Sequence, residues 1–160
     1  MMILSIRFLA ATVLAITALG ACTGESGQRD TAAEVAEVVV HKSPTCGCCT
    51  DWVEHLREAG FAVEVRETFN MAPIQQRVGL PYGLGSCHTA EVDGYFVEGH
   101  VPAEDVARLL AERPEARGLA VPGMPLGSPG MEVPSGEVEA YDVLLVLPDG
   151  STEVFARHGA

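Results

Sequence analysis

Short apolar runs and longer amphipathic segments alternate along the chain from about residue 36 onward. The valine run within residues 37–41 predicts a first strand. Apolar residues spaced three and four apart over residues 52–59 predict a helix, which Gly60 is well placed to end. Strict alternation of apolar and polar residues over 61–66 then predicts a second, half-buried strand.

The same reading extends through the middle of the chain. Residues 71–78 allow a short helix with a proline in its first turn. Residues 87–92 and 95–98 flank an Asp-Gly dipeptide, which favours a hairpin because a type I′ turn needs positive φ at both central positions. Residues 102–113 predict another helix. The predicted order is β-α-β-α-β-β-α, which defines an α/β domain.

The C-terminal part adds two features to this domain. Residues 118–132 are so rich in Gly and Pro that we expect a shaped loop rather than a helix or a central strand. Residues 141–147 and 152–155, joined by a Pro-Asp-Gly turn, predict a closing β-hairpin. The predicted fold is therefore an α/β domain with an added Gly/Pro/Met loop and a C-terminal hairpin.

The first 21 residues have the pattern of a secretory signal. Arg7 precedes an apolar run over residues 8–19 that is short for a membrane span. The stretch 19–22 resembles a bacterial lipobox, in which Cys22 becomes the lipidated first residue of the mature protein. The alternative is ordinary cleavage nearby, which would leave Cys22 as an unpaired thiol.

Residues 22–35 are mostly small or polar and predict a flexible tether, so the single folded domain spans residues 36–160. Thr23 stands where inner-membrane sorting would favour Asp, so for a Gram-negative source we expect a periplasmic lipoprotein anchored to the outer membrane. Contact with the membrane would then be through the N-terminal lipid alone. With 22 Asp and Glu against 10 Lys and Arg, the formal charge of −12 argues against binding to nucleic acid or anionic headgroups.

Three thiols, those of Cys46, Cys48 and Cys49, stand between the first predicted strand and the first predicted helix. A helix N-terminus stabilises thiolate over thiol, which makes sulfur a better nucleophile or metal ligand. Cys46 and Cys49 have the redox C-x-x-C spacing, whereas Cys48 is a sulfur that a two-thiol enzyme does not need.

The element order, with cysteines at the start of the first helix, resembles the thioredoxin fold over about residues 38–112. In that fold the loop before the third strand approaches the helix that carries the cysteines. The resemblance implies that residues 80–86 deliver Cys87 and His88 to face the other three thiols.

Convergence of four thiols favours a soft metal, above all Cu(I), and closely spaced sulfurs can bridge several such ions. Zinc is less well suited, because structural zinc sites usually draw on widely separated ligand pairs rather than three on one turn. A further alternative is a purely structural pair of disulfides, for instance Cys46–Cys49 and Cys48–Cys87, in a small secreted domain.

Other side chains extend the candidate site. Met124 and Met131 carry thioethers on the Gly/Pro-rich loop and are candidate soft-metal ligands or simple packing residues. His88 is a candidate ligand or acid–base neighbour, and the alternative is that it only caps or hydrogen-bonds the loop. His100 is expected to hold a loop or a ligand in place rather than to bind metal itself. Trp52 is expected to anchor the core beside the site.

The remaining histidines have weaker claims to a role. His41 ends the first predicted strand near the thiols. His55 lies on a helix face away from Trp52 and is expected to face solvent. His158, in the C-terminal tail, is expected to be inert.

Four motifs in the same order resemble the CopG-type family of periplasmic metal-binding proteins. They are Cys46-Gly47-Cys48-Cys49 with Trp52, Ser86-Cys87-His88-Thr89-Ala90, Glu98-Gly99-His100-Val101-Pro102-Ala103, and the stretch from Gly123-Met124-Pro125 to Met131-Glu132. The resemblance implies a thioredoxin-like domain, encoded with copper-resistance systems, that binds copper through clustered cysteines. The ligands it implies are Cys46, Cys48, Cys49 and Cys87.

We therefore expect a periplasmic copper-binding protein that contributes to copper resistance. It would sequester copper ions, exchange them with other periplasmic copper-handling proteins, or change their oxidation state. The alternative is a thiol–disulfide oxidoreductase that uses Cys46 and Cys49. Electron transfer between cysteine pairs and bound copper would join the two activities, so a copper/thiol oxidoreductase is also consistent with the sequence.

Overall fold

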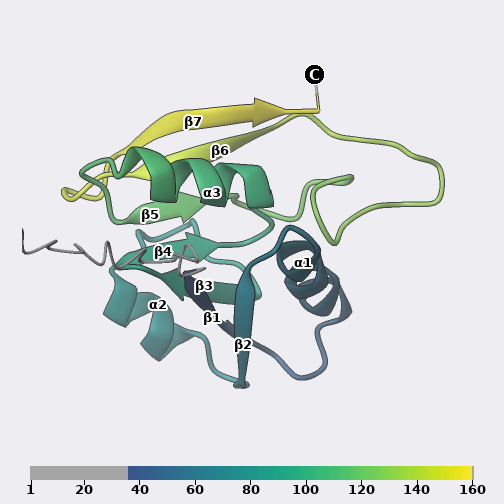
Figure 1. Ribbon diagram of the computed structural model, residues 1–160, viewed down its shortest axis with the longest axis horizontal. Coiled ribbons are helices and arrows are strands. Elements are labelled where there is room, and N and C mark those ends of the chain that lie inside the picture. The colour runs from purple at the N-terminus through teal and green to yellow at the C-terminus, as the bar shows by residue number, and fades with distance from the viewer. Residues whose placement is uncertain (1–35, 160) are drawn as a thin grey trace, which may run out of the picture. The chain divides into compact units, whose positions relative to one another are not determined.

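The structure is a computed structural model that describes residues 36–159 (Figure 1). The predicted signal segment, lipidation at Cys22 and tether lie outside these residues and stay predictions. Within the described range, no helix combines the length and the apolar character needed to cross a membrane.

Seven strands and three helices make up the described chain. In chain order they are β1 (Glu37–Lys42), α1 (Gly47–Glu58), β2 (Ala62–Glu67), α2 (Ala72–Val78), β3 (His88–Val92), β4 (Tyr95–Glu98), α3 (Ala103–Glu112), β5 (Gly118–Ala120), β6 (Tyr141–Val146) and β7 (Thr152–His158). The α/β class, the predicted order up to α3 and the C-terminal hairpin are confirmed.

All seven strands form one mixed sheet in the order β2-β1-β3-β4-β5-β6-β7. The β1–β2 and β4–β5 pairs are parallel, and the other four pairs are antiparallel. Parallel neighbours need a crossover connection, and α1 and α3 provide the two crossovers.

One prediction was wrong: residues 118–120 are not a loop but the strand β5, which lies between β4 and β6. A Cβ atom on Gly118 would lie 2.0 Å from the carbonyl oxygen of Phe96, so this glycine is what allows the two strands to pair so closely. Leu119 and Ala120 are fully buried and join different core clusters. Composition suggested a loop because the glycine needed for close pairing is also a common loop residue.

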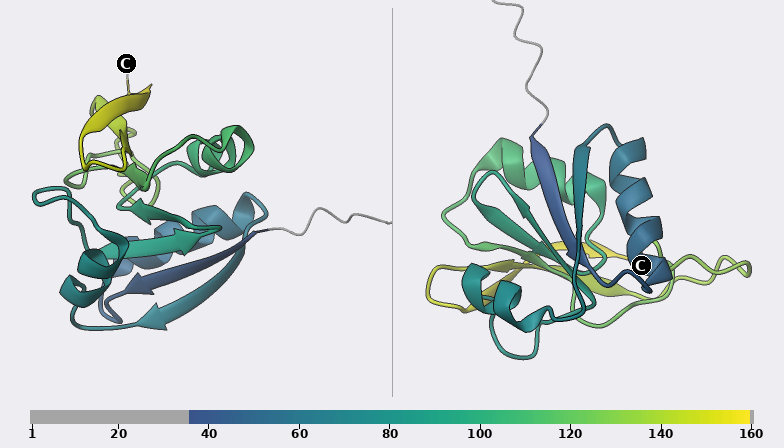
Figure 2. Two further views of the ribbon diagram at one scale, coloured as in Figure 1. Left: turned by 90° about the vertical axis from the view of Figure 1, so that its left-hand side faces the viewer. Right: turned by 90° about the horizontal axis from the view of Figure 1, so that it is seen from below.

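Two apolar clusters cover the two faces of the sheet, because successive strand residues point to opposite faces. On one face, Val97 and Leu119 pack with Trp52 of α1 and Leu109 of α3. On the other face, Phe96, Ala120 and Val146 pack against the region of α2. The views in Figure 2 show α1 and α3 on one side of the sheet and α2 on the other.

The sheet register brings three chain segments to one edge. Lys42, at the end of β1, pairs with His88 at the start of antiparallel β3. Thr89 pairs in turn with Glu98 at the end of β4. The turn into α1, the loop before β3 and the segment after β4 therefore meet, although they are far apart in sequence.

Candidate metal centre

The cysteine-rich turn forms the N-terminus of α1, as the sequence predicts. Cys46 is the N-cap residue, with extended backbone angles of φ −84° and ψ 106°, and Cys48 and Cys49 follow in the first turn. The Cys46 amide donates to the Ser43 carbonyl at 3.2 Å, and the Thr50 hydroxyl donates to the Cys46 carbonyl at 3.2 Å. A backbone hydrogen bond and the Thr50 hydroxyl thus hold this turn, and no side chain caps the helix N-terminus.

Cys46 and Cys49 are joined by a disulfide, with their Cα atoms 5.4 Å apart. Cys48 and Cys87 are free thiols, each partly buried. Of the two bridges weighed from the sequence, the structure therefore forms the first and not the Cys48–Cys87 bridge.

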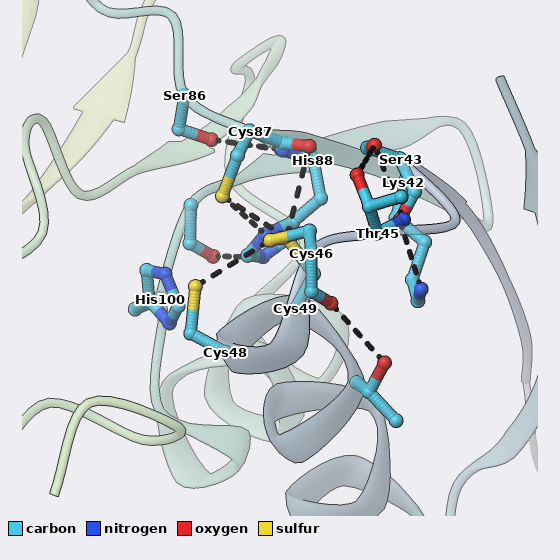
Figure 3. Close-up of a disulfide and its surroundings, with 12 residues drawn as sticks. Lys42, Ser43, Thr45, Cys46, Cys48, Cys49, Ser86, Cys87, His88 and His100 are labelled. Atoms are coloured by element: carbon cyan, nitrogen blue, oxygen red, sulfur yellow. Dashed lines mark hydrogen bonds between the residues drawn. A yellow bond between two sulfur atoms is a disulfide. The ribbon is translucent and has the colours of Figure 1, made fainter. Parts of the chain in front are cut away.

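Cys87 reaches the turn from the other side, and its sulfur lies 3.0 Å from the Sγ atom of Cys49. The Cys48 sulfur lies 3.4 Å from that of Cys46. Because disulfide sulfurs carry no hydrogen, the free thiols of Cys87 and Cys48 are the donors in these contacts. All four sulfurs lie within 4.8 Å of one another, as Figure 3 illustrates.

Cys87 is the thiol whose acidity is most clearly perturbed. Burial, reinforced by the nearby Cys48 thiol, raises the pKa of Cys87 to about 11. At neutral pH it is therefore a protonated thiol. A bound cation would reverse this, because a metal replaces the proton on a ligating thiol.

A buried carboxylate holds the loop that carries Cys87. Glu98 has no exposed surface and accepts hydrogen bonds from the Ser86 amide, the Ser86 hydroxyl, the Thr89 hydroxyl and the Gln75 side-chain amide, at 2.5–3.0 Å. Burial raises the pKa of Glu98 in spite of these donors. This network clamps the residues on both sides of Cys87 and His88.

Glu98 belongs to one of the four motifs, but no role was predicted for it from the sequence. The available signal is a single charged residue at the end of the otherwise apolar run Tyr95–Glu98. A charged residue inside a buried strand needs partners, but the strand pattern does not say which residues supply them.

Two imidazoles lie beside Cys87, and both are fully buried. The Nε2 atom of His88 donates to the Gly99 carbonyl at 3.0 Å, which leaves its Nδ1 atom 3.6 Å from the Cys87 sulfur. The Nδ1 atom of His100 donates to the Pro129 carbonyl at 2.8 Å. The rings of the two histidines meet edge to face, with their centroids 5.0 Å apart.

Both imidazoles are neutral near pH 7. Burial, with His100 as a neighbour, lowers the pKa of His88 to about 3. Burial likewise lowers the pKa of His100. Trp52 lies against His88, with the centroids of the two rings 4.4 Å apart. Its indole Nε1 donates to the Val101 carbonyl at 2.8 Å. The structure thus places Trp52 in the core beside the cysteines.

The two methionines have different positions. Met124 is 55% exposed and lies in a shallow hollow beside β6. Met131 is partly buried and follows Gly130, where an added Cβ would lie 2.6 Å from the Cys48 carbonyl oxygen. Only glycine fits there, so the segment carrying Met131 runs against the start of α1.

Two of the other histidines make contacts that were not predicted from the sequence. His55 is partly buried, and its Nε2 accepts a hydrogen bond from the Ala103 amide at 3.0 Å. His158 ends β7, contacts the Asp105 carboxylate at 2.6 Å and stacks on Tyr141. Both histidines thus form hydrogen bonds with residues in the first turn of α3, and folding brings them there from distant parts of the chain.

These features define an α/β protein with a multi-cysteine candidate metal centre at one edge of its sheet. Residues 84–131 match a family model described as a protein of unknown function, DUF411. No curated protein matches the chain.

Two solved structures are similar over most of the chain. The structure titled copper resistance protein CopG, Form 2, shares 46% identity, with a TM-score of 0.74, covering 78% of this chain and 99% of its own. Form 1 shares 45% identity with the same TM-score, covering 79% and 100%. The chain belongs to the CopG family of copper resistance proteins.

Proposed function

We propose that this protein binds copper ions as cargo through the sulfurs of Cys46, Cys48, Cys49 and Cys87, and that this binding is its contribution to copper resistance. The main observation in support is that these four sulfurs lie within 4.8 Å of one another. Two sulfurs on one ion about 2.3 Å away lie no more than about 4.6 Å apart, so this set needs little movement to close on a metal.

The binding form is the reduced protein. Two external thiol groups open the Cys46–Cys49 bond by supplying two electrons and two protons, leave as a disulfide, and make all four sulfurs available. Cu(I) is the oxidation state that fits them, because it is soft and favours thiolates. Three ligands crowded onto one helical turn, facing a fourth, suit sulfur bridging between several Cu(I) ions better than one isolated zinc tetrahedron. Met131 is a candidate additional ligand, whereas the exposure of Met124 makes it the weaker one.

The proposal includes the cellular setting expected from the sequence. Delivery to the periplasm and lipid attachment at Cys22 would place the cysteine site where it can exchange copper with other periplasmic proteins. Electron transfer between the Cys46–Cys49 pair and bound copper would be the route by which the protein changes the oxidation state of its cargo.

A thiol–disulfide oxidoreductase is the second candidate, and the disulfide next to a free thiol is the observation that favours it. In such a reaction the Cys87 thiolate would attack the Cys49 sulfur, and Cys46 would leave as a thiolate. The raised pKa of Cys87 counts against this step, because the thiolate is the nucleophile and little of it exists at neutral pH. Copper binding has no such difficulty, since the metal displaces the proton.

Anaerobic titration of the reduced mature protein with Cu(I), in competition with a calibrated chelator, tests the proposal. We expect more than one Cu(I) per chain, retained against an excess of Zn(II). Cys87→Ser should weaken Cu(I) binding by more than about tenfold, because it removes a ligand. A single zinc ion that survives copper challenge, or unchanged copper binding in Cys87→Ser, would contradict the proposed site.

A further inference from the structure

A second set of possible ligand atoms overlaps the four sulfurs at Cys87 alone. It consists of the sulfur of Cys87 and one ring nitrogen each from His88 and His100, which all lie within 4.8 Å of one another. With metal–nitrogen bonds of about 2.0 Å and metal–sulfur bonds of about 2.3 Å, two ligand atoms on one ion lie roughly 3.3–3.8 Å apart. The distance of 3.6 Å between the Cys87 sulfur and His88 Nδ1 falls within this range.

Backbone carbonyls orient both imidazoles as metal ligands usually are oriented. The Nε2–H group of His88 donates to the Gly99 carbonyl, so the Nδ1 atom carries the lone pair that faces Cys87. The Nδ1–H group of His100 donates to the Pro129 carbonyl, so the Nε2 atom carries the lone pair. A ligating histidine typically donates its other ring N–H to a carbonyl or a carboxylate in this way.

The Nε2 atom of His100 has no hydrogen-bond partner among residues 36–159, although it is fully buried. Buried acceptors are normally satisfied, so an orphan of this kind calls for an explanation. A metal ion between His100, His88 and Cys87 would satisfy it.

The disulfide separates this set from the four-sulfur set. While Cys46 and Cys49 are bonded to each other, neither can act as a thiolate ligand. Cys87 and the two histidines are untouched by that bond. The oxidised protein therefore keeps one complete set of metal ligands.

We propose that, in the disulfide form, Cys87 Sγ, His88 Nδ1 and His100 Nε2 form a separate site for a single copper ion. Two histidines and one cysteine are a ligand set that copper uses in proteins. This inference rests on the proposed function for the choice of copper. Opening the disulfide would offer that copper a more sulfur-rich environment, so the same protein would hold copper in both of its thiol states.

The test uses two proteins, the wild-type mature chain in its disulfide form and Cys46→Ser/Cys49→Ser, which permanently lacks both bridging sulfurs. Each is titrated anaerobically with Cu(I), and the ligands are identified by X-ray absorption spectroscopy. We expect one copper per chain in both, with two nitrogens and at least one sulfur around it. An all-sulfur shell, or no copper bound, would overturn the proposal without requiring any substitution of a buried histidine.

Substitution of the orphan histidine adds a second measurement. In the double variant, His100→Phe should weaken Cu(I) binding by more than about tenfold. His41→Phe is the matched control, because His41 is also a buried histidine at a strand end but bonds to Glu91 and lies outside both ligand sets. Circular dichroism checks that each variant is folded. Equal affinity in His100→Phe and His41→Phe would overturn the role of His100.

The two proposals can fail separately. If the reduced wild type binds several Cu(I) ions but the disulfide form and the double variant bind none, the four-sulfur site stands and the histidine site falls. If the double variant binds one copper through nitrogen while the reduced wild type binds no more than that, the four-sulfur site falls and the histidine site stands.

Discussion

The two segments that carry the cysteines are held in place by different means. The turn with Cys46, Cys48 and Cys49 rests on backbone hydrogen bonds, the exposed Thr50 hydroxyl and a covalent bond between two of its own sulfurs. The loop with Cys87 is clamped by Glu98, a buried carboxylate that accepts four hydrogen bonds, three of them from residues flanking Cys87 and His88.

This difference matters for chemistry. The four hydrogen bonds that Glu98 accepts come from Gln75, Ser86 and Thr89 and none comes from the sulfur-rich turn, so opening of the Cys46–Cys49 bond leaves the anchor of the Cys87 loop in place. The first wall of the site, the turn with Cys46, Cys48 and Cys49, is therefore adaptable, because its disulfide can form or break. The second wall, the Cys87 loop with His88 and His100, presents a thiol and two imidazoles in a fixed arrangement. Substitutions that weaken one wall should have little effect on the other.

The largest effect should come from removing the clamp. Glu98→Ala leaves the Ser86 amide and the buried Thr89 hydroxyl without their acceptor, and we expect a loss of about 3 kcal/mol in the free energy of unfolding. Urea denaturation followed by circular dichroism measures it. The matched change in the other wall, Thr50→Ala, removes one exposed hydrogen bond and should cost less than about 1 kcal/mol. Equal losses would contradict the contrast between the two walls.

The acidity of Cys87 should produce the next largest effect, about two orders of magnitude in a rate. A thiol of pKa about 11 holds roughly one two-hundredth as much thiolate at pH 8 as an ordinary cysteine of pKa about 8.5. Alkylation of Cys87 by iodoacetamide in the metal-free disulfide form should therefore be slow at pH 8 and rise about tenfold per pH unit towards pH 11.

Mass spectrometry of the peptide that contains Cys87 follows this reaction separately from Cys48. The pH at which the rate levels off reports the pKa, whereas partial burial lowers the rate at every pH. A plateau near pH 8 or 9 would show that Cys87 is an ordinary or activated thiol, and the disulfide-exchange alternative would then regain weight.

Cys48→Ala should produce the smallest of the three effects, a change of about tenfold in copper retention with the fold intact. It removes a bridging ligand from the adaptable wall but keeps the Cys46–Cys49 pair. We expect fewer Cu(I) ions per chain and about tenfold weaker retention against the chelator, with an unchanged circular dichroism spectrum. Cells that carry the variant should lose the copper tolerance that the wild type confers.

Turnover of an insulin-type disulfide substrate is the companion measurement for Cys48→Ala. Exchange by one thiolate and resolution by its partner need only Cys46 and Cys49. Normal copper content in the variant, together with vigorous dithiol turnover in the wild type, would reverse the ranking of copper binding over disulfide exchange.

Local patterns were sufficient for much of the fold. The valine run of β1, the helical spacing of Trp52 and Leu56, and the Asp-Gly turn after β3 each depend on neighbouring residues, and the structure has all three elements. The position of the cysteines at a helix N-terminus was likewise readable, because it requires only a strand followed by a helix. β5 was not predicted, because the need for glycine at position 118 comes from its close approach to Phe96 in another strand. No pattern of neighbouring residues reports such an approach.

The sequence by itself determined every element except β5, the sulfur-rich turn and the family resemblance, since these follow from the order and spacing of residues along the chain. Only the tertiary structure decided which cysteines pair, that Glu98 clamps the Cys87 loop, and that His100 presents an unpartnered nitrogen beside His88. The physical reason is that each of these facts depends on distances between segments that the sheet register brings together, and on the burial of polar groups that results.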